Sequence, residues 1–368
     1  AMKICYDEVD FQAALAEAFE VSGRHPVLLD RFLEGAVEYD IDAICDGREV
    51  HIAGIMEHIE EAGVHSGDSA CVIPPVDLQL EQAREMIDAT VRIGQRLGVV
   101  GLMNVQMAVA RDAEGRAEVH VIEVNPRASR TIPYVSKATA RPLVRMATRL
   151  CLGASLADVG LVADTVGAPV REELMHRGGF HFVKAPVFPW RRFSVQDIVL
   201  GPEMRSTGEV MGVGRSFGEA YAKALLGAGM NLPTEGGIFL SVRDADKGQI
   251  AEIAGPLYAM GFQLLATGGT HAALEAAGIP ARQVFKVREG RPDIVDHVRN
   301  GQIQLMINTP MGKKSVYDEA AMRLAGLRFG VPCITTLRAA HAAISAIRSL
   351  RAGELRAIKL QELPVITR

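Results

Sequence analysis

The sequence lacks several features that mark special classes of protein. Aromatic residues make up only 5% of its 368 residues, and tryptophan occurs once. No apolar run reaches the roughly 18 residues of a membrane-spanning helix, and the N-terminus lacks the charged-then-apolar pattern of a signal peptide. The formal net charge is only −4, and no basic patch predicts binding to DNA or RNA. We therefore expect a cytoplasmic protein that contacts neither membranes nor nucleic acids.

Cysteine is scarce as well. The sequence has five cysteines, an odd number spread far apart, which predicts neither a disulfide framework nor a thiolate zinc site. We expect each of them to be a small residue of the hydrophobic core, namely Cys5, Cys45, Cys71, Cys151 and Cys333.

What the sequence does contain is typical of a large globular protein. Apolar residues make up 48% and charged residues 23%, and a chain of this length exceeds what one core usually organises. Two or three domains are therefore expected. The strand-like segment 3–6 opens the chain with no residues leading into it, which predicts a fragment of a longer fold.

Apolar periodicity predicts an α+β arrangement in the first 152 residues. Asp46-Gly47 has the composition of a hairpin turn, and the polar segment 111–115 is expected to join two further strands into an antiparallel hairpin. The expected strands lie at 27–29, 37–45, 49–56, 101–110 and 118–124, and the expected helices lie at 10–20, 78–97 and 142–152.

The remainder of the chain has a different pattern. Residues 153–214 are rich in proline and glycine and are expected to form connecting structure. After residue 237 strands and helices alternate, which is typical of an α/β domain whose parallel sheet has helices on both faces. The expected strands lie at 238–242, 262–266 and 304–307, with a helix ending near 260 and another beginning near 270. We predict a domain at 1–152, a connecting region at 153–228 and a second domain at 229–368.

Four polar side chains are expected on one face of the second hairpin. Strand side chains alternate, so Glu123 and Asn125 share a face, as do Asn104 and Gln106 on the partner strand. Their oxygens suit a hard cation such as Mg²⁺, which binds one or two carboxylates together with substrate phosphates. An ordinary solvated sheet face is the alternative. Two arginines that follow within a turn of Asn125 favour the metal interpretation, because they can brace phosphoryl oxygens beside it.

The same hairpin belongs to a recognisable motif. Residues 121–130, VIEVNPRASR, followed by VSKAT at 135–139, resemble the signature of ATP-grasp enzymes of the carbamoyl phosphate synthetase family. Biotin-dependent carboxylases share only the first half of it. Two further parts resemble the large subunit of these synthetases, namely GIMEHIE at 54–60 with GVHSGDS at 63–69, and LGPEMRSTGEV at 200–210. The resemblance covers nearly the whole chain.

This resemblance implies a domain order and an activity. It implies a partial ATP-grasp domain of the half that forms carbamoyl phosphate, followed by a Rossmann-like, methylglyoxal synthase-like allosteric domain. The implied enzyme is a glutamine-hydrolysing synthetase that phosphorylates carbamate with ATP, for pyrimidine and arginine biosynthesis. Its implied partner is a small glutaminase subunit, in an oligomer of heterodimers. The front lobe of such a fold would precede this chain, so we expect the chain alone to be inactive in the forward reaction.

Matching positions imply the nucleotide site. Arg127 and Arg130 match catalytic arginines that face the phosphates. The positions that match ligands of Mg²⁺ or Mn²⁺ are Gln106, Glu123 and Asn125, of which Gln106 and Glu123 also belong to the ATP site. The positions that match adenine and ribose contacts are Asp30, Arg31, Leu33 and Glu38, and those of the loop beside the nucleotide are Gly63, Val64, His65 and Ser66. The family also implies K⁺ near His58, Glu60 and Ser66.

A second candidate site lies in the C-terminal domain. Residues 267–270, TGGT, precede a predicted helix, where free N–H groups and the helix dipole favour an anion. A Gly-Gly turn before a helix is also an ordinary helix boundary. The resemblance to the domain that binds UMP or IMP in bacterial synthetases favours the anion site. It implies effector contacts from Lys247, Thr267, Thr270, Lys286 and Asn308.

The site that binds the activator ornithine in this family is matched only in part. Pro310 stands where the bacterial pattern often has threonine, and Cys333-Ile334 replaces a tyrosine-aspartate pair. The positions that do match are Glu60, Asp68, Glu203 and Thr335. We therefore expect control by nucleotides, whereas the two replacements argue against ornithine activation.

Other functions are weighed against this interpretation. One alternative is a regulatory and assembly module that binds nucleotides without catalysis, which turnover would distinguish. A lyase like methylglyoxal synthase is disfavoured because no convincing aspartate cluster accompanies the TGGT turn. A biotin carboxylase is disfavoured because the segment after Arg127 departs from that family.

Overall fold

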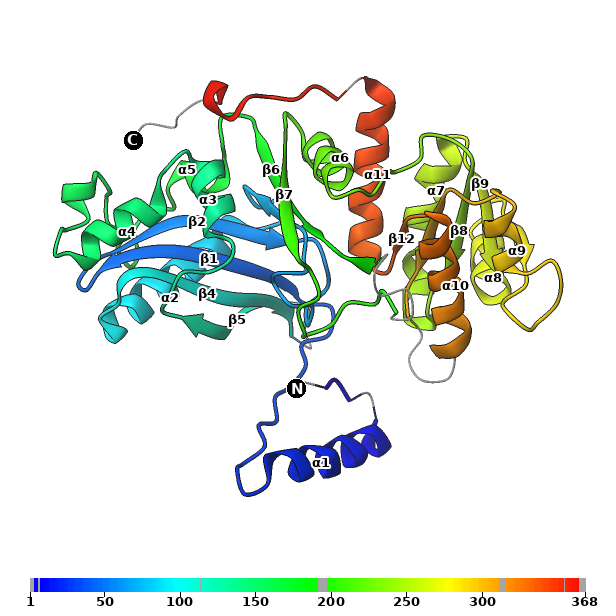
Figure 1. Cartoon of the computed structure of the whole chain (residues 1–368), viewed down its shortest axis with the longest axis horizontal. Coiled ribbons are helices and arrows are strands. Elements are labelled where there is room, and N and C mark those ends of the chain that lie inside the picture. Colours follow the sequence, from blue (N-terminus) through cyan, green and yellow to red (C-terminus); the bar gives the residue numbers. More distant parts are fainter. Residues whose placement is uncertain are drawn as a thin grey trace.

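The structure is a computed structural model with two β-sheets, one antiparallel and one parallel, that lie side by side (Figure 1). It describes residues 3–5, 7–112, 114–190, 197–310, 316–353 and 355–363. The two sheets confirm the predicted combination of an antiparallel sheet with helices and a Rossmann-like parallel sheet. Within the described ranges, no helix is both long and apolar enough to cross a lipid bilayer.

Seven antiparallel strands form the first sheet, in the order β5-β4-β1-β2-β3-β6-β7. Both predicted hairpins are present, and the backbone N–H of Asp46 donates to the carbonyl of Glu49 at 3.2 Å to close the first. The strand bounds are Val37–Asp46 (β1), Val50–His58 (β2), Cys71–Ile73 (β3), Val100–Arg111 (β4), Ala117–Asn125 (β5), His181–Val187 (β6) and Gly208–Gly214 (β7).

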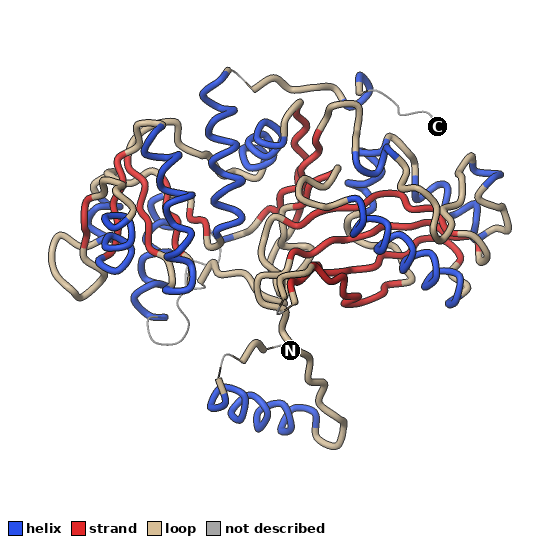
Figure 2. Tube along the Cα trace, turned by 180° about the vertical axis from the view of Figure 1, so that it is seen from behind, coloured by secondary structure: helices blue, strands red, loops and turns tan. Residues whose placement is uncertain are grey.

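Helices cover both faces of this sheet. Helix α2, Leu80–Leu97, packs Ala83 and Val91 against one face, while α3, Ile132–Thr139, and α4, Leu143–Cys151, pack against the other (Figure 1). The second face is only partly covered, and its polar end carries the candidate site described below. Two other helices in this half are α5, Glu172–Met175, and α1, Glu8–Ser22, which stands away from the sheets in Figures 1 and 2.

The second sheet has five parallel strands in the order β10-β9-β8-β11-β12. Helices lie on both of its faces (Figure 2). One face packs on α7, α8 and α11, and the other on α9 and α10. The bounds are Gly237–Ser241 (β8), Ile250–Ala259 (α7), Gln263–Thr267 (β9), Gly268–Ala276 (α8), Arg282–Val284 (β10), Ile294–Arg299 (α9), Leu305–Asn308 (β11), Val316–Phe329 (α10), Cys333–Ile334 (β12) and Leu337–Ala352 (α11).

The predicted connecting region contributes to the first sheet. It supplies β6 and β7, followed by helix α6, Phe217–Gly227. The backbones approach closely here, because a Cβ atom on Gly212 of β7 would lie 2.1 Å from the carbonyl oxygen of Ala220, and one on Gly218 would lie 2.3 Å from that of Ser345 in α11. Glycine is therefore required where β7, α6 and α11 stack. The predicted domain bounds stay a prediction.

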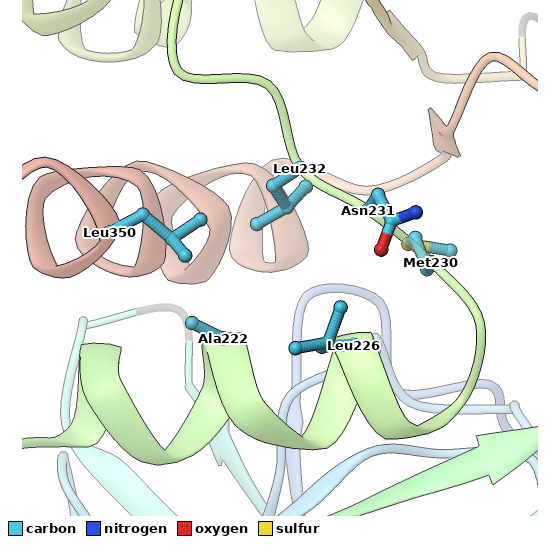
Figure 3. A pocket seen from close by; sticks show the side chains of 6 residues that line it. All are labelled: Ala222, Leu226, Met230, Asn231, Leu232 and Leu350. Carbon is cyan, nitrogen blue, oxygen red and sulfur yellow. The ribbon is translucent and has the colours of Figure 1, made fainter. Parts of the chain in front are cut away.

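Helices α6 and α11 join the two sheets through one apolar core. That core includes Val72 and Val183 of the first sheet together with Ile238 and Leu240 of the second. Serine and threonine side chains accept backbone N–H groups at the starts of α6 and α11, which fixes where these two helices begin. An apolar pocket lies between them (Figure 3), and its lining residues are Ala222, Leu226, Met230, Asn231, Leu232 and Leu350.

Several local predictions were wrong. Residues 27–29 form no strand, and Leu28 and Leu29 are 83% and 60% exposed, because no neighbouring strand pairs with them. Residues 3–5 form no strand either, and residue 6 lies outside the described residues. Two cysteines are buried, but Cys151 is exposed, and Cys5 and Cys333 are only half-buried.

Among the ion pairs that connect the two halves of the described structure, the Arg338–Glu57 and Arg323–Asp197 pairs each include a side chain that is at most 2% exposed. Arg338, in the first turn of α11, donates to Oε1 of the buried Glu57 in β2 at 2.8 Å, and to the carbonyl of His58 at 3.2 Å. Arg323 of α10 binds both carboxylate oxygens of Asp197, which lies between β6 and β7. The Glu57 carboxylate also accepts two backbone N–H groups, from residues 76 and 77, so its position is fixed from several sides.

We predict that Arg338→Met and Glu57→Gln each lower the free energy of unfolding by about 3 kcal/mol, because either change leaves the other member of a largely buried pair uncompensated. The double variant should lose little more than either single variant. Urea unfolding followed by circular dichroism measures this. A Lys3→Met variant, which removes the exposed Lys3–Glu17 pair, is the control and should change stability by less than about 0.5 kcal/mol. Additive losses would contradict the pairing.

Candidate active site

The polar face predicted from strand alternation forms at the hairpin of β4 and β5. Gln106 pairs with Glu123 and Asn104 with Asn125 across the two strands. The register shifts next to Gln106, so that Met107 pairs with Val121. This irregularity places one extra residue in β5 immediately before Glu123.

The exposed part of this face is a connected row of side chains. The amide nitrogen of Asn125 donates to Oε1 of Glu123 at 2.7 Å, and the guanidinium of Arg127 donates to Oδ1 of Asn125 at 3.0 Å. Arg130 is also exposed, and its guanidinium contacts the sulfur of Met204 at 2.6 Å. A carboxylate, an amide and one guanidinium group are thus linked by hydrogen bonds at the end of β5, and Arg130 follows in the same loop.

Glu38 connects this row to the predicted nucleotide loop. Its buried carboxylate accepts the Gln106 side-chain amide at 3.0 Å and the backbone N–H of Gly63 at 3.0 Å. Gly63 has φ +91°, and a Cβ atom there would lie 2.9 Å from the ring of Phe32. The bond to Glu38 uses the NH₂ group of Gln106 and not its carbonyl oxygen, which is the atom expected to bind a metal.

A buried histidine, His58, contacts the carboxylates of Glu38 and Asp40. Nε2 of His58 lies 2.9 Å from Asp40, and its Nδ1 lies 3.4 Å from Glu38. Burial alone would lower the pKa of His58, but contacts with Cys71 and Asp40 outweigh it and raise that pKa well above the ordinary value. His58 is therefore a positioning group that lies between two carboxylates.

Asp42 anchors the loop that carries the two arginines. Its carboxylate accepts hydrogen bonds from Asn104 at 2.9 Å, Ser129 at 2.9 Å and Thr131 at 2.6 Å. Burial raises the pKa of Asp42 to about 6, although these donors oppose the shift. Sequence reasoning missed this anchor. The available signal was the alternation of acids at residues 38, 40 and 42 in a strand that is otherwise apolar.

The other predicted nucleotide contacts are spread over nearby loops. Asp30 and Arg31 are exposed, and Leu33 packs beside Ala36 and Ala108. Nδ1 of His65 accepts the backbone N–H of Gly67, and the backbone N–H of His65 donates to the carbonyl of residue 201 at 2.9 Å. Val64 is half-buried. The Ser66 carbonyl, near which K⁺ was predicted, accepts the buried Lys184 ammonium at 2.9 Å.

The ligand set suits one class of metal. Among the described residues, no group of three or more histidine, cysteine, aspartate or glutamate side chains could hold an ion. The predicted set of Glu123, Asn125 and Gln106 has one carboxylate and two amides. That set fits Mg²⁺ or Mn²⁺ held partly by phosphate oxygens and water, and it does not fit a cage made of protein ligands alone.

The predicted effector contacts gather at the carboxyl ends of strands in the second sheet. Thr267 donates to the Ser241 hydroxyl at 3.0 Å, Thr270 accepts the Val242 N–H at 3.1 Å, and Asn308 donates to the Ser241 carbonyl at 3.0 Å. All three side chains are buried.

Two lysines belong to the same predicted set. A Cβ atom on Gly269, in the first turn of α8, would lie 2.7 Å from Nζ of Lys247, so this ammonium lies over the start of the helix. Asp244 binds Lys247 at 2.5 Å and also interacts electrostatically with Lys286. A cationic patch partly balanced by one exposed carboxylate therefore borders the turn.

The positions that match the ornithine site lie between the sheets. Burial and the neighbouring Glu61 raise the pKa of Glu60 to about 7. Asp68 accepts the backbone N–H groups of Arg205 at 2.7 Å and Ser206 at 2.8 Å, so both its oxygens hold a loop. Glu203 is exposed and Thr335 is half-buried. The replacements at 333–334 form strand β12.

A series of hydrogen bonds runs between the two candidate sites. Arg323 donates to Oδ1 of Asn308 at 2.7 Å and binds Asp197. The carbonyl of Asp197 accepts the Arg205 guanidinium at 2.8 Å, and the Arg205 N–H donates to Asp68. The N–H of Asp68 donates to the carbonyl of His65 at 2.7 Å. The predicted effector and nucleotide loops are therefore connected.

Comparison with known proteins identifies the family. Residues 1–159 match the family described as carbamoyl-phosphate synthase L chain, ATP binding domain, and residues 249–335 match the MGS-like domain. The carbamoyl phosphate synthase large chain of Acidobacterium capsulatum is 48% identical over 363 residues, which cover 99% of this chain and 32% of the relative. The C-terminal section of that large chain from Aquifex aeolicus is 46% identical, covering 95% of this chain and 65% of the relative. The chain therefore belongs to the carbamoyl phosphate synthase large-chain family.

The chain spans about a third of the length of the full-length relatives that it matches. Solved structures that match part of this chain include the biotin carboxylase domain of 2-oxoglutarate carboxylase from Hydrogenobacter thermophilus. That domain is 16% identical, with a TM-score of 0.42, covering 61% of this chain and 53% of that one.

We predict that Asp42→Ala accelerates trypsin cleavage after Arg130 roughly tenfold, because the two hydrogen bonds from Ser129 and Thr131 to the buried carboxylate no longer hold the loop. Timed digestion followed by mass spectrometry of the fragments measures this. Cleavage after Arg116, in the exposed turn between β4 and β5, is the internal control and should not change. Asp42→Asn should have a smaller effect, since its amide keeps one accepting oxygen. Equal acceleration at both sites would indicate general unfolding and contradict the anchoring role.

Proposed function

We propose that this chain forms part of an ATP-dependent carbamoyl phosphate synthase and contributes to phosphorylation of carbamate. The observation that carries the proposal is the connected row of Glu123, Asn125 and Arg127 at the open end of the first sheet, anchored by Asp42 and Glu38. A row that combines metal-binding oxygens with guanidinium groups suits the transfer of a phosphoryl group.

Each part of the row has a proposed role. Glu123, with the amide oxygens of Gln106 and Asn125, would hold Mg²⁺ or Mn²⁺. A metal held by these residues would offset the negative charge of the phosphates. Arg127 and Arg130 donate hydrogen bonds to the oxygens of the phosphoryl group that moves between ADP and carbamate.

The surrounding residues bind and orient the nucleotide in this proposal. Leu33 offers an apolar surface to adenine, with Asp30 and Arg31 beside it. Glu38 and the loop at 63–66 contact the ribose and its phosphates. The reaction requires no general base in this scheme, because positioning and charge neutralisation dominate phosphoryl transfer. His58 accordingly acts only by holding Asp40 and Glu38 in place.

The wider assignment follows from the family. We propose a cytoplasmic synthase in which a small glutaminase subunit supplies ammonia, for pyrimidine and arginine biosynthesis, with K⁺ as an additional cation and heterodimers that associate further. The MGS-like domain would bind UMP or IMP at Lys247, Thr267, Thr270, Lys286 and Asn308. The Arg338 guanidinium pairs with Glu57 and also acts on Glu60, one of the positions that match the ornithine site. A cation of the protein itself therefore already lies at this site, which supports the proposal that ornithine does not activate the enzyme.

We expect the chain to bind ADP only when Mg²⁺ is present, and Glu123→Gln to weaken that binding about tenfold or more, because it removes the carboxylate from the ligand set. Calorimetric titration with ADP, in Mg²⁺ and then in EDTA, measures this. Glu118→Gln, a change to another exposed carboxylate of β5, is the matched control and should bind like the wild type. Unchanged affinity in Glu123→Gln would refute the metal assignment.

Turnover separates the catalytic proposal from the regulatory and assembly alternative. The reaction of MgADP with carbamoyl phosphate yields ATP and carbamate. ATP formation that disappears in Arg127→Ala supports catalysis by this row. Binding of MgADP without ATP formation supports a nucleotide-binding module that depends on further parts of the enzyme.

We expect Lys247→Met to weaken UMP binding about tenfold, since it removes a charge-assisted hydrogen bond at the start of α8. Equilibrium dialysis with labelled UMP measures the affinity. Lys359→Met removes a lysine from an exposed surface pair and should leave UMP binding unchanged. Equal affinities in wild type and Lys247→Met would place the effector elsewhere.

A further inference from the structure

Three arginines gather beside the beginning of β2, and the proposed function uses none of them. This arginine cluster consists of Arg141, between α3 and α4, Arg171, before α5, and Arg177, after α5. Two carboxylates, Asp164 and Glu173, lie among them.

Arg171 is fully engaged. Its guanidinium donates to both carboxylate oxygens of Asp164, at 2.8 and 3.0 Å, and to the carbonyl of Ile52 at 2.5 Å, and it also pairs with Glu173. Asp164 in turn accepts the backbone N–H of Ile52 at 2.7 Å. Both carboxylates of the cluster are therefore oriented toward Arg171 by direct contacts.

Arg141 reaches a neutral histidine. Nδ1 of His51 contacts the Val162 carbonyl at 2.6 Å, and its Nε2 contacts the Arg141 guanidinium at 2.6 Å. Burial and the positive charge of Arg171 lower the pKa of His51 to about 4, so the ring is uncharged at neutral pH. Neutral His51 donates from Nδ1 and accepts at Nε2, which satisfies one N–H of Arg141 and supplies no negative charge.

Arg177 is buried with one unsatisfied N–H group. It is only 6% exposed, and its Nε has no hydrogen-bond partner among the described residues. Burial, followed by the charge of Arg141, lowers the pKa of Arg177 to about 10, so it still carries its charge at neutral pH. A buried guanidinium whose Nε–H has no acceptor is unfavourable, because that N–H has lost water without gaining a partner.

The charges of the cluster do not cancel. Three guanidinium groups give three positive charges, Asp164 and Glu173 give two negative charges, and His51 is neutral, which leaves one positive charge. We propose that a small inorganic monoanion binds between Arg141 and Arg177 and supplies the missing charge and hydrogen-bond acceptors. The site recognises the anion by charge and by converging N–H donors, and a halide serves as the probe.

We expect bromide to raise the Tm of the full 368-residue chain when it replaces gluconate, a bulky anion, at constant ionic strength. Arg177→Gln should abolish the bromide dependence of Tm, and in gluconate it should unfold at a higher Tm than the wild type because it removes the uncompensated charge. Arg215→Gln is the matched control, since Arg215 lies nearby over the Phe180 ring but is exposed. It should keep the wild-type response.

A variant that removes a negative charge instead of a positive one provides a second test. Glu173→Gln removes one of the two negative charges, so the half-saturating bromide concentration should fall several-fold. Crystals grown in bromide should show an anomalous peak between Arg141 and Arg177, which tests the site even if a variant does not fold. A missing peak, or the same bromide dependence in wild type and Arg177→Gln, would overturn the proposal. Because the test involves no nucleotide, its failure is distinct from failure of the proposed function.

Discussion

The candidate active site depends on buried negative charge in one strand. Glu38, Asp40 and Asp42 of β1 are at most 6% exposed, yet each carries a carboxyl group. Carboxylates buried in a sheet are unfavourable unless donors surround them. Here the donors come from Gln106, Asn104, His58, Gly63, Ser129 and Thr131. Hydrogen bonding to the three buried carboxylates of β1 therefore fixes the positions of β2, β4 and two loops. The exposed row of Glu123, Asn125 and Arg127 extends from that fixed arrangement.

Local patterns in the sequence predicted the parts of the fold that depend on interactions between residues close together in the chain. Alternation placed Glu123 and Asn125 on one face, and the strand-helix alternation after residue 237 predicted the parallel sheet. The same reasoning failed at Leu28 and Leu29, since apolar composition alone makes no strand without a partner. It also did not place β6 and β7 in the first sheet, because β6 pairs with β3, which lies more than a hundred residues earlier.

For the candidate site, too, the sequence indicated some residues and missed others. Residue types and the family resemblance indicated the exposed residues that are proposed to bind metal and phosphate, whereas the anchoring roles of Asp40 and Asp42 were missed. Each anchor joins residues far apart in the sequence, such as Asp42 with Ser129 and Thr131. The cluster of Arg141, Arg171 and Arg177 was likewise missed, because arginines separated by other elements carry no local signal of convergence.

The ion pairs between the sheets limit how the two halves can move. Arg338 holds Glu57 near the edge of β2, and Arg323 holds Asp197 in the loop between β6 and β7. The apolar core that α6 and α11 share with both sheets attaches the two halves over a packed surface as well. A rotation of the second sheet against the first must therefore separate packed side chains of this core and also stretch or break the ion pairs. A change in the relative orientation of the two sheets thus requires a different packing of the shared core and cannot be a free rotation about either pair.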